Sequence, residues 1–504
     1  MNETVPPISI FLADEAETIR LGEELALTVQ PGDCIALIGD LGAGKSTLAR
    51  ALIRAIAGDQ YLEVPSPTFT IVQSYDLRFP VAHLDLYRLS DASELDELGI
   101  DEMLTDGVCL IEWPEMAANV LPNDSTITLR LTHQSEGRVA TIDAPPRQRA
   151  RFERVLAIRD FLDQNGKQNA SRQYFSGDAA YRTYELVSDI KGQSLLMDWQ
   201  PPPKGPVIKD GKTYAEIVHL AREVTPFVAI DNYLSANGFS VPAILAQDLE
   251  RGILLLEDMG RDGVLDAEGN PIEERYLASV ACLAALHDAY ASGDITLTNG
   301  TTYQVPRFDA DAMKIETSLL LDWYLPYIHD AEIDNSERQG FFAVWDQLIE
   351  KLDNAETGLL LRDFHSPNII WQPEKTGTDR VGIIDFQDAM IGPKAYDLAS
   401  IIQDARVTIS PDMQARLMAH YLGIRRNNPA FNEASFLRAF AIMAAQRNCK
   451  LAGIWVRLMK RDGKPHYMKH MPRTFAYLGS ALEHPDLDIL RYWFERAGID
   501  IHKE

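Results

Sequence analysis

The chain has 504 residues, a hydrophobic share of 46% and a formal net charge of −26. This length exceeds what one hydrophobic core usually supports, so we expect two or three domains. No apolar run approaches the roughly 18–20 residues of a membrane helix, and the acidic, proline-containing start is not that of a signal peptide, which predicts a cytoplasmic protein with no membrane partner.

The negative charge is concentrated near the start of the chain. Residues 1–146 hold 8 Lys and Arg against 24 Asp and Glu, which is more than half of the net charge. A surface that binds nucleic acid by itself should be basic. We therefore expect this third of the chain to contact a basic protein partner and to reach nucleic acid only indirectly.

Strand-like and helical segments alternate in the first 146 residues. The apolar runs at 33–39, 81–89 and 107–113 are typical of buried strands, and STLARALIRAIAG (46–58) has helical periodicity. This alternation predicts an α/β domain with a mostly parallel sheet. Two prolines in DAPPRQRA (143–150) interrupt the pattern, so we place the end of the first domain at residue 146.

Residues 147–504 begin with strand-like segments and become mainly helical from about residue 272. YRTYELVSD (181–189) and QSLLMDWQ (193–200) indicate strands, and the run 242–260 indicates a hairpin that turns at Glu250–Gly252. The pattern predicts an α+β domain of two lobes, a small lobe over about 150–260 and a helical lobe over about 261–504.

The segment GDLGAGKS (39–46) fits the phosphate-binding pattern G-x-x-x-x-G-K-[S/T]. An apolar strand precedes it and a helical run follows it, as the motif requires. Its glycines let backbone N–H groups face a pyrophosphate, Lys45 adds a positive charge, and the Ser46 hydroxyl can bind Mg²⁺. The first domain is therefore predicted to bind ATP and Mg²⁺.

A P-loop nucleotidase also needs an acid at the end of a strand. Asp85 follows VAHL and Glu112 follows VCLI, so a buried strand would deliver either carboxylate to the sheet edge. Each acid taken alone could also be an ordinary surface residue. The hydroxyl groups of SPTFT (66–70) could sense the γ-phosphate.

Four stretches in order resemble the TsaE family, the small ATPase of the bacterial machinery that makes threonylcarbamoyladenosine in tRNA. They are GDLGAGKSTLAR, VPSPTFTIV, HLDLYRL and LIEWPE, and the resemblance covers residues 8–142. It implies ATP hydrolysis with Mg²⁺ and docking on the other subunits of the threonylcarbamoyl-transfer complex. It also implies that Glu112 and Ser46 hold Mg²⁺ and that Asp85 lies at the reaction edge. The nucleotide-binding residues that it implies are Glu15, Leu41, Gly42, Ala43, Gly44, Lys45, Ser46, Thr47 and Arg138.

A second phosphate-handling motif lies at RDFHSPN (362–368), which has the D-x-x-x-x-N spacing of a kinase catalytic loop. There Asp363 would accept the proton of the attacking hydroxyl and Asn368 would help to hold Mg²⁺. Asp385 follows the strand-like VGII and would supply a second metal ligand. The spacing alone is more often a polar turn, but Asp385 and an upstream β lobe together favour phosphoryl transfer.

The small lobe offers the remaining parts of a kinase. FSGDAAYRTYEL (175–186) predicts a strand, a loop of small residues and a strand, which suits the covering of phosphates. LLMDWQPPP (195–203) has no Lys where protein kinases place one, so Arg182 is the candidate replacement. Glu257 and Met259 lie where a hinge would bind adenine through its backbone.

These segments, with RDFHSPNIIW and VGIIDFQDAMIGPKAYDLASIIQDAR, resemble the aminoglycoside phosphotransferase superfamily. Within it they are most similar to the AmgK-type kinases, which phosphorylate the anomeric hydroxyl of N-acetylmuramate or N-acetylglucosamine. The resemblance covers about 150–490 and implies an ATP-dependent amino-sugar kinase of peptidoglycan recycling. Leu361 stands where many relatives have His.

Other interpretations of the second domain stay open at this point. It could phosphorylate another small alcohol or an aminoglycoside, or it could regulate the ATPase without catalysis. Arg447 and Lys450 lie three residues apart in a helical pattern. They could meet the carboxylate of a sugar or form an ordinary salt-bridged face.

Overall fold

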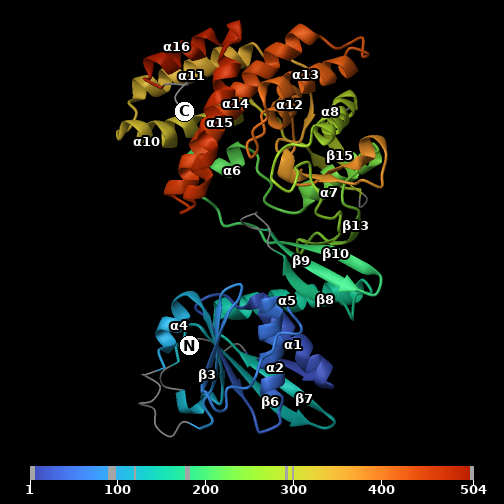
Figure 1. Cartoon of the computed structure of the whole chain (residues 1–504), viewed down its shortest axis with the longest axis vertical. Coiled ribbons are helices and arrows are strands. Elements are labelled where there is room, and N and C mark those ends of the chain that lie inside the picture. The colour runs from blue at the N-terminus through green and yellow to red at the C-terminus, as the bar shows by residue number, and fades with distance from the viewer. Residues whose placement is uncertain are drawn as a thin grey trace. The chain divides into compact units, whose positions relative to one another are not determined.

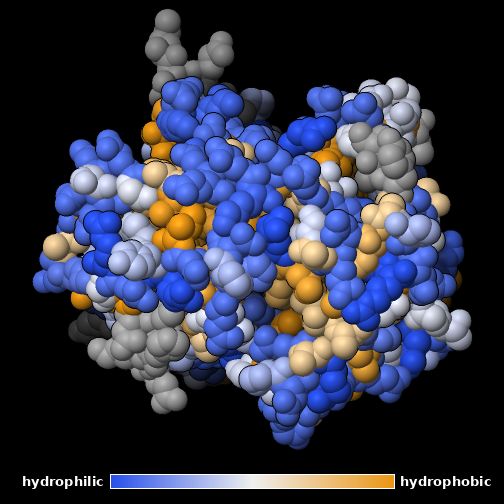
Figure 2. Space-filling view, turned by 90° about the horizontal axis from the view of Figure 1, so that it is seen from above, coloured by the Kyte–Doolittle hydropathy of each residue, from blue (hydrophilic) through white to orange (hydrophobic). Residues whose placement is uncertain are grey.

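The computed structural model describes residues 6–88, 98–117, 121–175, 182–289, 293–297 and 300–499. The chain forms two compact units, Met1–Asp198 and Trp199–Glu504 (Figure 1). Within the described ranges, no helix has the length and apolar character needed to cross a membrane. The surface in Figure 2 is mostly hydrophilic, with apolar residues in separate small groups.

A sheet in the order β1-β7-β6-β2-β5-β4-β3 forms the centre of the first unit. The inner strands β6, β2, β5 and β4 are parallel, whereas β1, β7 and β3 pair antiparallel at the edges. The sheet is therefore mixed, with the expected parallel strands at its centre, because β3 and β7 each pair with the neighbouring strand through a hairpin. Its strands are β1 (Ile8–Leu12), β2 (Cys34–Ile38), β3 (Val72–Asp76), β4 (Pro80–Asp85), β5 (Val108–Glu112), β6 (Thr126–Gln134) and β7 (Gly137–Asp143).

Helices cover both faces of this sheet, as Figure 1 shows. Alternate residues of a strand point to opposite faces, so Ile35 packs in one core with α1 (Glu15–Thr28) and α2 (Lys45–Ala57), whereas Cys34 packs in another with α4 (Ile100–Asp106). α1 and α2 approach closely at Gly22, where a Cβ atom would lie 2.7 Å from the Leu48 carbonyl oxygen.

The first unit continues beyond the predicted domain boundary. α5 (Pro146–Gln164) starts at residue 146 and packs on α1. Its Arg159 Nε lies 3.2 Å from Glu24 Oε1, and Glu24 is only 2% exposed. A buried carboxylate needs such a partner. The adjacent strands β8 (Ser171–Phe175), β9 (Arg182–Asp189) and β10 (Gly192–Trp199) follow in the spatial order β10-β9-β8.

The second unit begins with short strands and becomes mainly helical from α8 (Glu273–Asp288) onward. The expected hairpin is formed by β13 and β14, which pair antiparallel. The strands are β11 (Val207–Lys209), β12 (Lys212–Thr213), β13 (Ile244–Asp248), β14 (Ile253–Glu257), β15 (Asp294–Thr296), β16 (Thr302–Gln304), β17 (Thr357–Leu360), β18 (Ile369–Trp371), β19 (Val381–Ile383) and β20 (Met390–Pro393).

The long helix α14 is the central element of the helical part of this unit (Figure 1). It packs against α9, α12 and α15. A Cβ atom at Gly453 would lie 2.2 Å from the Leu319 carbonyl oxygen, so only glycine lets α14 approach α9 this closely. The helices are α6 (Tyr214–Ile217), α7 (Thr225–Ala236), α8 (Glu273–Asp288), α9 (Ala310–Leu319), α10 (Leu325–His329), α11 (Asn335–Glu350), α12 (Ala395–Ile402), α13 (Pro411–Arg425), α14 (Glu433–Lys460), α15 (Met471–Leu482) and α16 (Asp488–Arg496).

Candidate active sites

The loop between β2 and α2 has the backbone that a phosphate-binding loop requires. Gly42 and Gly44 have φ angles of 80° and 105°, which side chains disfavour. A Cβ atom at Gly39 would lie 2.6 Å from the Leu131 carbonyl oxygen. The glycines of the motif are therefore needed for the shape of the loop as well as for access by a ligand.

A cavity of about 500 Å³ opens above this loop. It brings together every residue predicted for the first site except Ala43, which is 1% exposed and belongs to the hydrophobic core. The lining residues that were predicted are Glu15, Leu41, Gly42, Gly44, Lys45, Ser46, Thr47, Asp85, Glu112 and Arg138. Sequence reasoning missed Tyr87, Arg88 and Trp113, which also line it.

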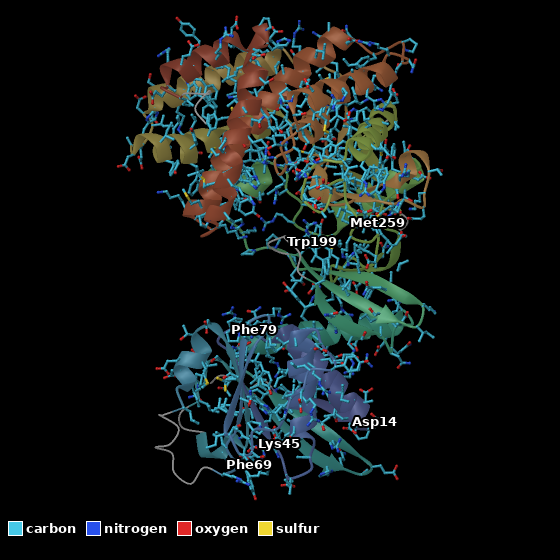
Figure 3. All side chains as sticks on the ribbon, viewed as in Figure 1. Asp14, Lys45, Phe69, Phe79, Trp199 and Met259 are labelled. Carbon is cyan, nitrogen blue, oxygen red and sulfur yellow. The ribbon has the colours of Figure 1, made fainter. Side chains whose placement is uncertain are left out.

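Lys45, which is labelled in Figure 3, is the first residue of α2, and its side chain contacts the preceding loop. Its Nζ donates to the carbonyl oxygens of Gly39 at 2.6 Å and Asp40 at 3.1 Å, and it lies 3.6 Å from the centre of the Trp113 ring. Burial lowers the pKa of Lys45, and the negative charge of Glu112 opposes this shift. The ammonium group is thus held at the place where phosphates would bind.

The two predicted acids lie side by side at the ends of parallel strands, because Asp85 and Glu112 are register partners of β4 and β5. Ser46 Oγ donates to Glu112 Oε2 at 2.9 Å, and His83 Nε2 lies 3.0 Å from Glu112 Oε1. Ser66 Oγ lies 3.5 Å from Asp85 Oδ2. A hydroxyl beside a carboxylate fits the coordination of Mg²⁺ in a P-loop. His83, which orients Glu112, was not predicted.

Arg138 reaches the same cavity from β7. Its Nη1 lies 3.4 Å from Thr18 Oγ1, and a Cβ atom at Gly44 would lie 3.6 Å from the Arg138 guanidinium carbon. The guanidinium group therefore stands beside the phosphate-binding loop, where a positive charge would attract a bound nucleotide.

In the second unit, the loop from β17 to β18 carries Asp363 and Asn368, and the segment after β19 brings Asp385 beside them. The Asn368 side chain donates from Nδ2 to the Asp363 carbonyl oxygen at 2.9 Å and lies 3.4 Å from Asp385 Oδ2. Arg362 and Asp385 have φ angles of 71° and 61°, which are uncommon for residues other than glycine. Such backbone strain is often found at functional sites.

Two buried acids that sequence reasoning missed hold this loop in place. Asp397 accepts the N–H groups of Leu361 and Arg362 at 2.6 and 2.9 Å. Burial raises the pKa of Asp397 to about 7, against the effect of these hydrogen bonds. Asp404 accepts the Ser366 N–H at 2.8 Å. The run KAYDLASIIQDAR contains both, but its spacing alone does not reveal what they contact.

The pKa of Asp363 is set by opposing effects. Burial raises it, but the electrostatic effect of the neighbouring Lys450, His365 and Arg362 outweighs burial, so the pKa lies below its ordinary value. The Asp363 carboxylate is therefore ionised at neutral pH and can accept a hydrogen bond from a hydroxyl group.

Arg447 and Lys450 prove to have partners inside the protein. Lys450 Nζ lies 3.0 Å from Glu316 Oε1, and the guanidinium group of Arg362 pairs with the same carboxylate. Arg447 Nη1 donates to the Gln403 carbonyl oxygen at 3.2 Å. The salt-bridged alternative is confirmed for Lys450, although the pair is buried.

Replacing Glu316 by Gln should lower the free energy of unfolding by about 3–5 kcal/mol, because Arg362 and Lys450 would stay buried without their counter-charge. Thermal and urea unfolding measure this loss, with the exposed Glu350→Gln as the matched control. Equal stability of both variants would contradict the prediction.

The same carboxylate predicts a pH dependence. Burial raises the pKa of Glu316, but Lys450 and Arg362 outweigh it and lower the pKa from 4.5 to about 2. Its contribution to stability is therefore present above pH 4.5 and lost as the pH falls toward 2. Between pH 4.5 and 2, the free energy of unfolding should fall less steeply with decreasing pH in Glu316→Gln than in the wild-type protein. Parallel pH profiles of the two proteins would contradict the assignment.

The two residues predicted for the adenine-binding hinge form contacts within the protein itself. Glu257 uses its backbone N–H and its carboxylate to bind Ala243, at 2.8 and 3.1 Å. Met259 follows β14 (Figure 3), and its carbonyl oxygen lies 3.4 Å from Gln372 Nε2. Arg182 begins β9 in the first unit. The expected phosphate-covering loop at 176–181 lies outside the described residues, so its role stays a prediction.

No group of three His, Cys, Asp or Glu in the described ranges is placed to hold a metal ion by itself. This is compatible with kinase and P-loop sites, where Mg²⁺ is bound by one or two side chains and by the phosphates of the substrate. Asn368 and Asp385 provide oxygen atoms of the required kind, so the residues fit such an ion.

The fold and the two sites define a P-loop nucleotide-binding protein joined to a kinase-like phosphotransferase. The family model "Threonylcarbamoyl adenosine biosynthesis protein TsaE" matches residues 12–140, and the model "Phosphotransferase enzyme family" matches residues 171–435. The chain therefore belongs to the phosphotransferase enzyme family and, in its first part, to the TsaE family. Both resemblances noted in the sequence are confirmed.

Curated relatives fall into the same two groups. The chain is 32% identical over 355 residues to an N-acetylmuramate/N-acetylglucosamine kinase of Caulobacter vibrioides, with 68% of this chain and 96% of that protein covered. A kinase with the same description from Pseudomonas aeruginosa is 31% identical, with 61% and 82% covered. The tRNA threonylcarbamoyladenosine biosynthesis protein TsaE of Haemophilus influenzae is 38% identical over 135 residues, with 25% and 84% covered.

Proposed function

We propose that the chain is a bifunctional cytoplasmic enzyme. Its first part hydrolyses ATP in support of threonylcarbamoyladenosine modification of tRNA. Its second part uses ATP to phosphorylate the anomeric hydroxyl of N-acetylmuramate or N-acetylglucosamine, a reaction suited to peptidoglycan recycling. The proposal is supported by the two family matches and by relatives from both groups, most of whose length is covered by this chain.

The observation that carries the kinase proposal is the meeting of Asp363, Asn368 and Asp385 in one loop system. The Asp363 carboxylate accepts the proton of the sugar hydroxyl as that oxygen forms a bond to the γ-phosphorus of ATP. The bond from this phosphorus to the bridging oxygen breaks, and ADP leaves. Asn368 and Asp385 would hold Mg²⁺, which neutralises charge on the phosphates.

In the first part, Lys45 and the loop N–H groups bind the phosphates, while Ser46 and Glu112 would hold Mg²⁺. Asp85 lies beside Glu112, and in this proposal it positions the attacking water. The acidic composition of residues 1–146 suits an ATPase that acts through the other subunits of the threonylcarbamoyl-transfer complex and contacts tRNA only indirectly.

Two assays test the proposal. The purified full chain is incubated with γ-labelled ATP and a panel of N-acetylmuramate, N-acetylglucosamine, choline, homoserine and an aminoglycoside. We expect a sugar 1-phosphate, identified by ³¹P NMR, and transfer to none of the sugars would overturn the kinase proposal. Separately, the chain should restore threonylcarbamoyladenosine in the tRNA of bacteria depleted of TsaE. Failure to restore it would overturn the proposed function of the first part of the chain.

A further inference from the structure

The residue that precedes the proposed base has a strained backbone. Arg362 has a φ angle of 71°, and the Asp363 N–H donates to the Leu361 carbonyl oxygen at 2.9 Å. A hydrogen bond between residues two apart defines a γ-turn, and a positive φ angle at its centre gives the rare, strained form. Glycine adopts such angles readily, whereas other residues do so at a cost. The direction in which the Asp363 side chain leaves the loop therefore depends on a turn that an arginine does not favour by itself.

Arg362 is held in this turn by contacts from outside the loop. Its side chain is buried, and its guanidinium group pairs with the carboxylate of Glu316 on α9. Its Nη1 also donates at 3.0 Å to the carbonyl oxygen of Val218, the residue that caps the end of α6. Its backbone N–H donates at 2.9 Å to Asp397 on α12. Contacts with three separate helices therefore fix both the backbone and the side chain of Arg362.

The carboxylate that anchors Arg362 is itself fixed. Glu316 is 0% exposed, its Oε1 lies 3.0 Å from Lys450 Nζ, and its Oε2 accepts from Gln446 Nε2 at 2.9 Å. Gln446 and Lys450 lie four residues apart on α14, so they present their polar groups on the same face of that helix. An ion pair with hydrogen bonds that is shielded from water is stronger than an exposed pair. The anchor of Arg362 is therefore connected to the central helix of this unit.

Stability alone does not explain why an arginine occupies this position. When two charged groups are buried together, the loss of their hydration offsets most of their attraction, and apolar residues of similar volume are often as stable. At the centre of a γ-turn with a positive φ angle, glycine would also avoid the backbone strain. What the ion pair of Arg362 and Glu316 adds is a fixed geometry in the residue next to the base.

We propose that Arg362 is a positioning residue of the kinase reaction: its ion pair with Glu316 holds the γ-turn so that the Asp363 carboxylate stays directed at the acceptor hydroxyl. The proposal rests on the kinase function proposed above and adds to it a residue that acts through the base. A general base must lie within hydrogen-bond reach of the hydroxyl that it deprotonates. A displacement of about 1 Å can lower the rate by about 10²-fold. Losing the anchor should therefore affect the chemical step and not the binding of substrates.

The test measures kcat and KM for N-acetylmuramate, N-acetylglucosamine and ATP in the full chain carrying Arg362→Gly or Arg362→Lys. Arg362→Gly suits the φ angle of the turn but removes the anchor. We expect its kcat to fall about 10–100-fold while the KM values for sugar and ATP stay within about twofold. Arg362→Lys keeps a charge for Glu316 but not the fork that also reaches Val218, so its kcat should fall less. It also provides the test if Arg362→Gly fails to fold.

A double-mutant cycle separates positioning from a general structural role. In a protein that already carries Asp363→Asn, the base is absent, so either Arg362 change should alter the remaining rate by less than about twofold. Arg425→Lys is the matched control, because Arg425 is also buried and pairs with Asp288 and Glu356, which lie outside the catalytic loop. This control should keep kcat within about twofold of the wild-type value.

The other outcomes overturn the positioning role in distinguishable ways. A loss of the same size in the Asp363→Asn background, or in Arg425→Lys, would indicate a general structural effect. A rise in KM without a fall in kcat would assign Arg362 to substrate binding. Wild-type kcat in both Arg362 variants would show that the turn needs no anchor, and the kinase function would still stand. A wild-type protein that phosphorylates neither sugar would overturn the kinase function and the positioning role together.

Discussion

Replacement of Asp363 by Asn is expected to reduce sugar phosphorylation by about 10²–10⁴-fold, the usual contribution of a general base. The amide cannot accept the proton that the sugar hydroxyl must lose. The loop should keep its shape, because its bonds at this position use the backbone: Asn368 Nδ2 and the His365 N–H both donate to the Asp363 carbonyl oxygen. Transfer of labelled phosphate to the sugar measures the effect.

The control for this variant is Asp353→Asn, which makes the same change at an exposed position. It should phosphorylate sugar at the wild-type rate. ATP hydrolysis that depends on Lys45 should be unchanged in both proteins. If Asp363→Asn kept most of its sugar kinase activity, Asp363 would not be the base, and the interpretation of the loop as a catalytic loop would be wrong.

Replacement of Lys45 by Ala is expected to reduce ATP hydrolysis at the first site by about 10²–10³-fold, the effect of removing one preorganised charge from a developing negative centre. The side chain is only 5% exposed and contacts the loop carbonyl oxygens and the Trp113 ring. The substitution would therefore remove two things together: the positive charge that is proposed to bind the phosphates, and a packing contact. Steady-state ATP hydrolysis without sugar measures the result.

Lys45→Arg tests whether a positive charge alone is sufficient, because it keeps the charge but not the point geometry of the ammonium group. We expect both variants to keep sugar kinase activity, and both to fail to restore threonylcarbamoyladenosine in depleted cells. Normal tRNA modification by Lys45→Ala would contradict the assignment of the first site. Parallel loss of kinase activity would instead indicate that the protein had misfolded.

The residues predicted for the first site line one cavity, because they are close in the chain or lie at strand ends. Asp85 and Glu112 were found from apolar runs that end in an acid, and parallel strands bring such ends together. His83 was missed, because a histidine inside a strand has no pattern that reveals its partner. Ala43 belongs to the motif through its position, yet its side chain faces the core.

For the second site, the sequence indicated the motif but not the residues that hold its loop in place. Asp363, Asn368 and Asp385 follow a spacing that sequence reasoning can recognise. The carboxylates of Asp397 and Asp404 accept hydrogen bonds from a loop that lies more than 30 residues earlier in the chain. Such long-range contacts are set by tertiary packing and not by local pattern.

The contact of α5 with α1 has a consequence for how the two enzymes can be separated. Arg159 lies beyond the part of the chain that the TsaE family model matches, yet it supplies a counter-charge to Glu24 inside that part. A chain truncated after residue 146 would lose this counter-charge, and Glu24 would keep only Arg20 of the same helix, whose Nε lies 3.8 Å from Glu24 Oε1. A shortened chain that is meant to retain the first site should therefore end after α5 and not at residue 146.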